Sequence, residues 1–242
     1  MPIHDWTRVS AGGFHNFHQD WTIEIYRALN RGVLPAGYMA FTDLKVNGVE
    51  PDAVTIRTDP VAPSGGLAVA DTPPQVRQAA RAESEVGTYA RRGNRVLIRH
   101  NYGPVVAVIE VISPGNKNSR HAVRAFTSKA VEFLRSGVSV LFVDLFPPTR
   151  RDPDGLHRLV WEELSDEPFD PRPPDKPLSI AAIDAGDPLT VYVEPLAVGD
   201  LLPDGPLFLA PGRYVNVPFE ATYRAAWEVT PTPIRDEVQP PA

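Results

Sequence analysis

Apolar residues recur at three- and four-residue steps near the N-terminus, which is the period of an amphipathic helix. They lie on one face of the segment 15–29 and its flank: Phe14, Phe17, Trp21, Ile25 and Leu29. Gly32 and Pro35 follow this run, and both residues disfavour continuation of a helix. The pattern therefore predicts a helix that ends just after Leu29.

Two nearly continuous apolar runs lie in the middle of the chain. Residues 105–112 read VVAVIEVI, and residues 138–146 are apolar except for Ser139 and Asp144. Runs rich in β-branched residues are typical of strands buried on both faces. Between them, residues 119–135 carry an apolar helical face, and Gly137 is a suitable stop. This order predicts a strand–helix–strand unit with parallel strands.

Shorter segments complete an α/β pattern. Strands are expected at 38–46, 52–57, 178–184 and 189–194, and a hairpin at 85–90 and 95–100. The Pro- and Gly-rich segment 59–76 predicts an exposed loop, and SPGN at 113–116 predicts a turn. Further helices are expected at 157–164 and 218–229, followed by a frayed tail. The fold class is α/β, with a mixed central sheet flanked by helices.

Composition narrows the picture without naming a function. The chain has 242 residues, 27 of them Pro and none Cys, and a net charge of -6. The lack of Cys excludes disulfides, thiolate metal sites and a Cys nucleophile. The acidic balance counts against a protein that only coats DNA. No apolar run is long enough for a membrane span and no signal peptide is evident, so the expectation is a cytoplasmic protein with no membrane partner.

Two acidic residues and two lysines are the strongest candidates for chemistry. Asp52 begins a strand and Glu110 lies inside the most apolar run, where an unpaired charge is costly. Lys117 and Lys129 follow Glu110. In one account Glu110 pairs with a lysine or reaches solvent. In the other, Asp52 and Glu110 share Mg²⁺ (or Mn²⁺), which accepts hard oxygen ligands and activates water while a lysine orients the nucleophile.

Several of these segments resemble a bacterial family of unassigned function, DUF 4058. They are HNFHQDW at 15–21, EPDAV at 50–54, VVAVIEVISPGNK at 105–117, GVSVLFVDLF at 137–146 and LLPDGPLFLAPGRYV at 201–215. The order of PD, EVIS, a helical Lys and a GV strand is also similar to the Uma family of restriction-endonuclease-like proteins, a branch of the PD-(D/E)XK superfamily.

The second resemblance implies a restriction-endonuclease-like core over residues 1–146, with residues 147–242 as a C-terminal extension on the same domain. It implies Asp52 and Glu110 as metal ligands. The superfamily pattern has Lys two residues after the second acid, where this chain has Ile112. The lysine would therefore come from elsewhere, either from Lys129 on the following helix or from Lys117.

Other residues are further candidates for this site. Glu24 on the first helix is a further candidate metal ligand, although a solvated surface charge is the simpler interpretation. His15 and His18 have a spacing compatible with metal but no evident third ligand. Asp144 either orients Lys129 or forms a simple salt bridge. A basic hairpin containing Arg91, Arg92, Arg95, Arg99 and His100 could contact nucleic acid or protect a sheet edge.

The leading hypothesis is a metal-dependent phosphodiesterase, a nuclease acting on DNA or a related nucleic acid. The alternative is a catalytically inactive descendant of that fold serving as a binding or scaffolding module. A small-molecule enzyme on another α/β scaffold stays open because fold does not dictate function. The expected partners are DNA and, as a homodimer, a second copy of the chain.

Overall fold

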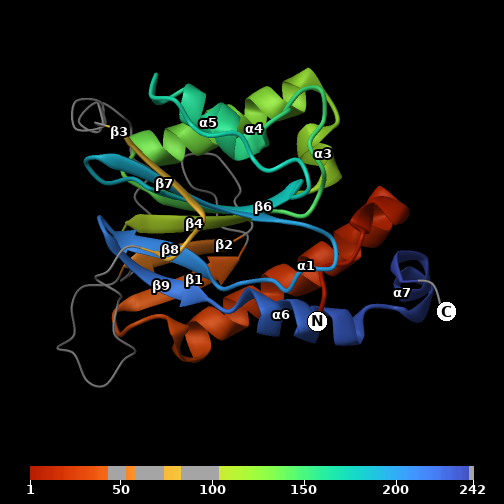
Figure 1. Ribbon diagram of the computed structural model, residues 1–242. Coiled ribbons are helices and arrows are strands. Elements are labelled where there is room, and N and C mark those ends of the chain that lie inside the picture. The colour runs from red at the N-terminus through yellow and green to blue at the C-terminus, as the bar shows by residue number, and fades with distance from the viewer. Residues whose placement is uncertain (43–52, 58–73, 83–103, 240–242) are drawn as a thin grey trace.

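Strands from distant parts of the chain form one mixed sheet. The computed structural model describes residues 1–42, 53–57, 74–82 and 104–239 (Figure 1). Within these ranges, seven strands are hydrogen-bonded in the order β1-β2-β4-β5-β6-β7-β3. Their bounds are β1 Tyr38–Thr42, β2 Ala53–Arg57, β3 Gln78–Ala82, β4 Val105–Val111, β5 Ser139–Asp144, β6 Leu178–Asp184 and β7 Leu189–Leu196.

The centre of the sheet is the expected strand–helix–strand unit. β4 and β5 are parallel, with Glu110 opposite Phe142, whereas the other neighbouring strands are antiparallel. The connection contains α3 (Pro114–Lys117) and α4 (Arg120–Arg135). Ser119 caps α4, because its hydroxyl accepts a hydrogen bond from the amide of Ala122. The prediction of parallel strands joined by a helix is therefore confirmed.

Successive side chains of each central strand point to opposite faces of the sheet. In β4, Ala107, Ile109 and Val111 belong to one apolar cluster, whereas Val108 and the following Ile112 belong to another. Both faces of β4 and β5 are buried, which explains why the sequences of these strands are continuously apolar rather than alternating.

One face of the sheet is covered by the N- and C-terminal segments together. α1 (Ala11–Ala28) and α6 (Phe219–Val229) lie side by side beneath it, next to a second sheet of β8 (Gly205–Ala210) and β9 (Arg213–Val217) (Figure 1). The apolar residues of α1 that the three- and four-residue spacing picked out are the buried ones, so this helix prediction is confirmed.

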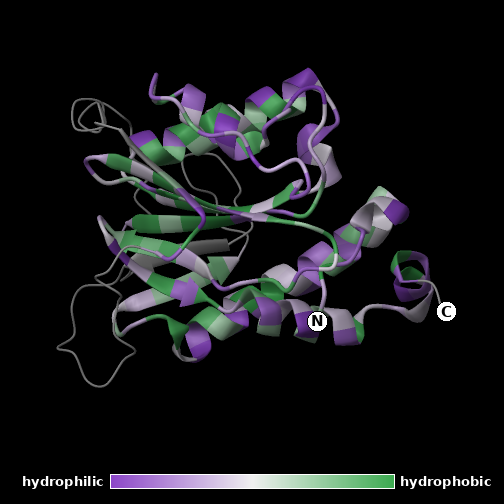
Figure 2. Cartoon of the chain, viewed as in Figure 1, coloured by the Kyte–Doolittle hydropathy of each residue, from purple (hydrophilic) through white to green (hydrophobic). Residues whose placement is uncertain are grey.

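The opposite face is covered by α4 and α5 (Leu156–Glu162). Phe126 of α4 packs against Phe142 of β5, with ring centroids 5.2 Å apart. Figure 2 shows the hydrophobic residues concentrated in the central strands, while the helices alternate between hydrophilic and hydrophobic positions. The result is a layered α/β fold in which β6 and β7, from beyond residue 146, continue the same sheet.

A buried aromatic cluster fixes the N-terminal segment to α6. The Tyr223 hydroxyl accepts a hydrogen bond from the indole nitrogen of Trp6 at 3.0 Å and lies 2.8 Å from Nδ1 of His4. Trp6 begins the short helix η1 (Trp6–Arg8). The His4 ring stacks on Trp227, with centroids 3.7 Å apart. These contacts join the two ends of the chain on one face of the sheet.

Three expectations need correction or addition. The C-terminal residues form a helix, α7 (Thr232–Val238), where a frayed tail was expected; Val238 is buried against the core. Sequence patterning also missed β3, β8 and β9. SPGN contains one helical turn, because Ser113 and Asn116 cap α3 reciprocally. The expected hairpin at 85–100 lies outside the described residues.

In the part of the chain that the structure describes, no helix combines the length and apolar character needed to cross a membrane.

We expect Tyr223→Phe to lower the free energy of unfolding by about 1–3 kcal/mol, because the buried Trp6 N–H loses its acceptor. Urea unfolding followed by tryptophan fluorescence measures the change. Tyr214→Phe is the matched control: Tyr214 is also buried, and the described residues give its hydroxyl no hydrogen-bond partner. The control should change stability by less than about 0.5 kcal/mol. Equal losses in the two variants would contradict the role of the Tyr223 hydroxyl.

Candidate functional site

Glu110 is a buried carboxylate on the α4-covered face of the sheet. It lies in β4 between Val108 and Ile112, both of which pack in the cluster beneath α4 and α5. Only 5% of the residue is exposed to solvent. Because burial removes the hydration of a carboxylate, an ionised Glu110 requires a compensating cation.

Lys129 of α4 supplies that cation. Its Nζ atom lies 2.5 Å from Oε1 of Glu110, and its side chain is 19% exposed. The helix α4 connects β4 to the parallel strand β5 and packs over the sheet, which places Lys129 next to Glu110. The structure therefore brings together the acid and the lysine that the sequence singled out, one from the strand and one from the following helix.

Ile112 lies on the same face as Glu110, two residues further along the chain. Its side chain is 1% exposed and belongs to the apolar cluster beneath α4. The amide of Ile112 donates a hydrogen bond to the carbonyl of Val143 at 2.8 Å. The position where the PD-(D/E)XK pattern has Lys is therefore part of the core, and the ammonium beside Glu110 comes from α4.

Lys117, the second lysine considered, has a different set of partners. Its Nζ atom lies 2.6 Å from Oδ2 of Asp144 and 3.1 Å from Oδ2 of Asp152, and it donates to the carbonyl of Phe146 at 3.0 Å. It also contacts the carbonyl of Pro147 at 3.4 Å. An ammonium has three protons to donate, and these buried acceptors are sufficient to satisfy them. Lys117 thus forms a buried structural ion cluster, and Asp144 pairs with Lys117 where a contact with Lys129 had been considered.

The same cluster orders the segment after β5. Asp152 accepts a hydrogen bond from the amide of Thr149 at 2.9 Å, while the amide of Phe146 donates to Oδ1 of Asp144 at 3.2 Å. Arg151 donates from Nη1 to the carbonyl of Lys117 at 3.4 Å. The residues from 144 to 152 are therefore fixed to α3 through one buried lysine.

Burial shapes the titration of two groups near this cluster. Desolvation raises the pKa of Asp144, and the adjacent Lys117 ammonium opposes the rise. His157 has its pKa lowered to about 3, mainly by burial and further by the positive charge of Arg172. The imidazole is therefore neutral near pH 7 and carries no positive charge into the cluster.

Glu24 is separated from Glu110 by the sheet. α1 packs on the face that contains Ile109 and Val111, whereas Glu110 points to the other face. The Glu24 carboxylate lies 2.5 Å from the guanidinium of Arg27 one turn away. The structure therefore does not bring Glu24 to Glu110 as a shared metal ligand, and supports the surface-charge interpretation.

Asp52 lies outside the described residues, as does the basic hairpin with its four arginines and His100. The described strand β2 begins at the next residue, Ala53, which pairs with Ile109 of β4. Ile109 immediately precedes Glu110 in the sequence.

The donor set for a divalent metal is incomplete in the described part of the chain. No group of three or more His, Asp or Glu side chains able to hold a metal occurs there. The pair His15 and His18 is therefore without a third ligand among the described residues. The oxygen of Glu110 is of a kind that Mg²⁺ accepts, and Mg²⁺ commonly binds one or two carboxylates together with waters. The described residues thus contain one of the two carboxylates expected to bind a metal.

Comparison of the chain with protein-family models, curated proteins and solved structures finds no match.

Sequence reasoning did not single out Asp152, Thr149 or His157 as members of a cluster. Thr149 and Asp152 lie in the acidic, Pro-rich segment after β5, and His157 lies in the helix expected at 157–164. The available signal was the spacing of Thr149 and Asp152, since an Asp three residues after a Thr can accept hydrogen bonds from the turn between them. That signal indicates a turn but gives no indication that it is buried.

Replacing Lys117 with Met should destabilise the protein by about 3–5 kcal/mol, because two buried carboxylates lose their cation. The penalty should increase with pH. Without the Lys117 ammonium, which opposes the effect of burial, the folded-state pKa of Asp144 rises further. An Asp with a raised folded-state pKa binds more protons folded than unfolded, so the variant loses additional stability as the pH rises through that pKa. Urea unfolding at about pH 5 and about pH 8 tests both effects.

Lys176→Met is the control, since Lys176 forms a more exposed pair with Asp200 at 2.5 Å. It should cost about 1 kcal/mol or less at either pH. A Lys117→Met variant as stable as this control would show that the buried cluster is not needed for folding.

Proposed function

We propose that the protein hydrolyses phosphodiester bonds of DNA with divalent metal, and that Glu110 and Lys129 lie at the centre of its site. The observation that carries the proposal is the 2.5 Å contact between Lys129 Nζ and Glu110 Oε1 on a largely buried face. A carboxylate that binds a metal and a lysine that acts on the same phosphate must lie close together.

The fold and strand register add support. A mixed sheet with helices on both faces is what the resemblance to the PD-(D/E)XK superfamily implies. Ala53, the first described residue of β2, pairs with Ile109, the residue before Glu110. Asp52 directly precedes Ala53 in the sequence, and its carboxylate is a ligand of the kind that Mg²⁺ accepts. The proposal therefore takes Asp52 as the second carboxylate.

In this proposal Glu110 and Asp52 would hold Mg²⁺ or Mn²⁺, which supplies Lewis-acid polarisation of the phosphate and lowers the pKa of a bound water. The residues of the chain do the rest. Lys129 stabilises negative charge that develops on a phosphoryl oxygen, because an ammonium in a partly buried site is screened weakly by water. Its position on α4 replaces the lysine that Ile112 cannot provide. The proposal is in keeping with the resemblance of the sequence to the DUF 4058 and Uma families.

One observation favours a second candidate, a non-catalytic member of the same fold that binds or scaffolds. Lys129 already pairs with Glu110, and Ile112 is packed in the core. An acid and a lysine that neutralise each other in this way also form an ordinary buried ion pair. Such a protein would retain the fold and a ligand but lack metal-dependent cleavage.

Glu110→Gln and Lys129→Met should each reduce Mg²⁺- or Mn²⁺-dependent cleavage of a labelled DNA duplex by about 100-fold or more, since each removes one charge that stabilises the transition state. Calorimetric titration with Mn²⁺ should show weaker binding to Glu110→Gln than to the original chain. Glu132→Gln, an exposed change on the same helix, is the matched control and should leave both properties unchanged.

Thermal unfolding of every variant distinguishes lost chemistry from lost folding. Cleavage that is indifferent to both substitutions would exclude this site. If the unsubstituted protein neither binds Mn²⁺ nor cleaves DNA, the nuclease proposal is excluded and the non-catalytic candidate is favoured.

A further inference from the structure

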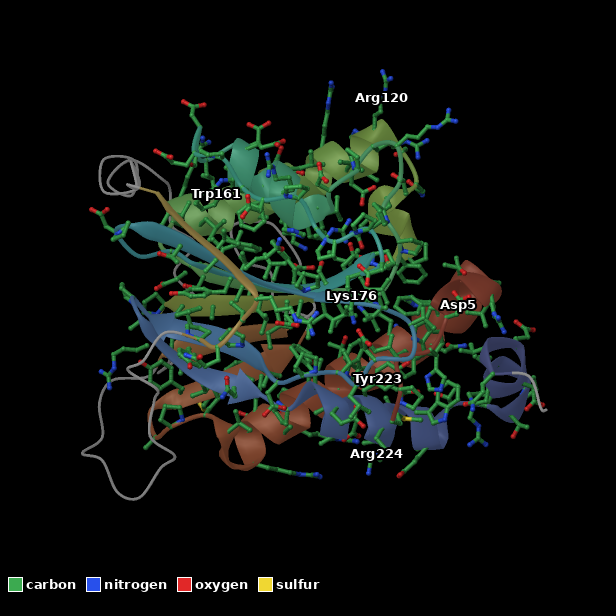
Figure 3. The ribbon with its side chains drawn as sticks, in the orientation of Figure 1. Asp5, Arg120, Trp161, Lys176, Tyr223 and Arg224 are labelled. Carbon is green, nitrogen blue, oxygen red and sulfur yellow. The ribbon has the colours of Figure 1, made fainter. Side chains whose placement is uncertain are left out.

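A groove lined by arginines runs between α4, α5 and the loop at 149–151. Its volume is about 870 Å³, and it is open along the surface. Four guanidinium groups line it, from Arg120, Arg124, Arg150 and Arg151. Figure 3 shows Arg120 pointing away from the sheet at the start of α4. A concentration of four positive groups is notable in a chain whose net charge is -6.

The charges of this groove are largely uncompensated. Within the described ranges, Arg120, Arg124 and Arg150 form no ion pair or hydrogen bond, and Arg151 contacts a backbone carbonyl. Two glutamates also line the groove. Glu162 is paired with Arg158 at 2.7 Å, which leaves the carboxylate of Glu163 facing four arginines. Positive charge with no internal partner favours an anionic ligand.

The arginines are held on ordered supports. Arg120 and Arg124 are four residues apart on α4 and therefore share one side of the helix. Arg150 and Arg151 lie in the loop that the Lys117 cluster fixes through Thr149 and Asp152. The two pairs thus approach the groove from different elements, so the positive charge extends along the groove and not around a single point.

We infer that this groove binds the phosphate backbone of double-stranded DNA. Guanidinium forks match phosphate oxygens, and the exposed hydroxyl of Ser128 at the groove is a further donor of the kind that contacts phosphates. The described residues lining the groove include no aromatic side chain. Single-strand binders usually stack bases on aromatic rings, so this lining favours a duplex contacted through its backbone, without sequence preference.

The choice of DNA over other polyanions rests on the proposed function, but the groove is a separate site from Glu110 and Lys129. At 100° per residue, Lys129 is about 140° around the axis of α4 from Arg124. The arginines therefore face α5, while Lys129 faces Glu110 on the other flank of the same helix. A duplex in the groove would hold the substrate through contacts remote from the reacting phosphate.

The test is the salt dependence of duplex binding. Anisotropy of a fluorescein-labelled DNA duplex is measured in EDTA, so that no cleavage occurs. The combined variant Arg120→Ala, Arg124→Ala, Arg150→Ala should bind at least about tenfold more weakly at moderate salt, and its slope of log affinity against log salt should be shallower by about 2.7, or about 0.9 per lost contact. The single strand of the same sequence should bind more weakly than the duplex.

Matched variants keep the result interpretable. Arg135→Ala removes an exposed charge from the other end of α4, outside the groove, and should leave the slope unchanged. Arg124→Lys keeps the charge and should keep the slope. All the substituted arginines are exposed, and thermal unfolding confirms that each variant is folded.

The two proposals fail separately. A chain that cleaves DNA but whose slope is unaffected by the triple substitution retains the proposed function and loses the groove. A chain that binds duplex through these arginines without cleaving it retains the groove and loses the proposed catalysis. Absence of duplex binding, or equal loss in Arg135→Ala, overturns the groove assignment, and tight binding of inorganic polyphosphate alone would assign it to a different anion.

Discussion

The ion pairs of the buried Lys117 ammonium hold three segments together. These segments are α3, the end of β5 and the loop at 149–151. The contacts of Lys117 with Asp144, Asp152 and the carbonyl of Phe146 replace hydration that all these groups lose on folding. A cluster of this kind adds little net stability compared with apolar packing of the same volume, but it fixes geometry strictly, because loss of one member leaves the others uncompensated. That geometry determines where Arg150 and Arg151 lie, and hence the shape of the groove.

The predictable parts of the fold are those in which the pattern of apolar and polar residues fits only one kind of element. The continuous apolar runs of β4 and β5 required burial on both faces, and the helical spacing in α1 and α4 required burial on one face. The parallel pairing of β4 and β5 followed from the strand–helix–strand order. β3 was missed because Gln78–Ala82 has the composition of a helix or loop, and its pairing with β7 overrides that propensity. β8 was missed because Gly205 and Pro206 begin it, and β9 because it is short and carries the polar residues Arg213 and Asn216. Gly205 is nevertheless required, because Phe219 leaves no room there for a side chain.

The candidate site was predictable as far as the free-energy cost of burying a carboxylate requires a nearby cation. A carboxylate within an apolar strand must find a cation, and Lys129 was identified as one of two available on the following segment. The sequence alone could not decide between the lysines, because the choice depends on how α4 lies across the sheet. Nor could it show that Lys117 is occupied, because Asp152 comes from a segment whose proline content masks its burial. The two pairs of groove arginines, at 120 and 124 and at 150 and 151, are far apart in the sequence and become neighbours only when α4 packs beside that segment.

The two charged regions share one rigid support. α4 is a single helix of 16 residues that packs through Phe126 on Phe142, with Lys129 on one flank and the two arginines on the other. The apolar stripe between these flanks is therefore the shared foundation of both charged regions, and a core substitution at Phe126 would disturb the ion pair and the groove together.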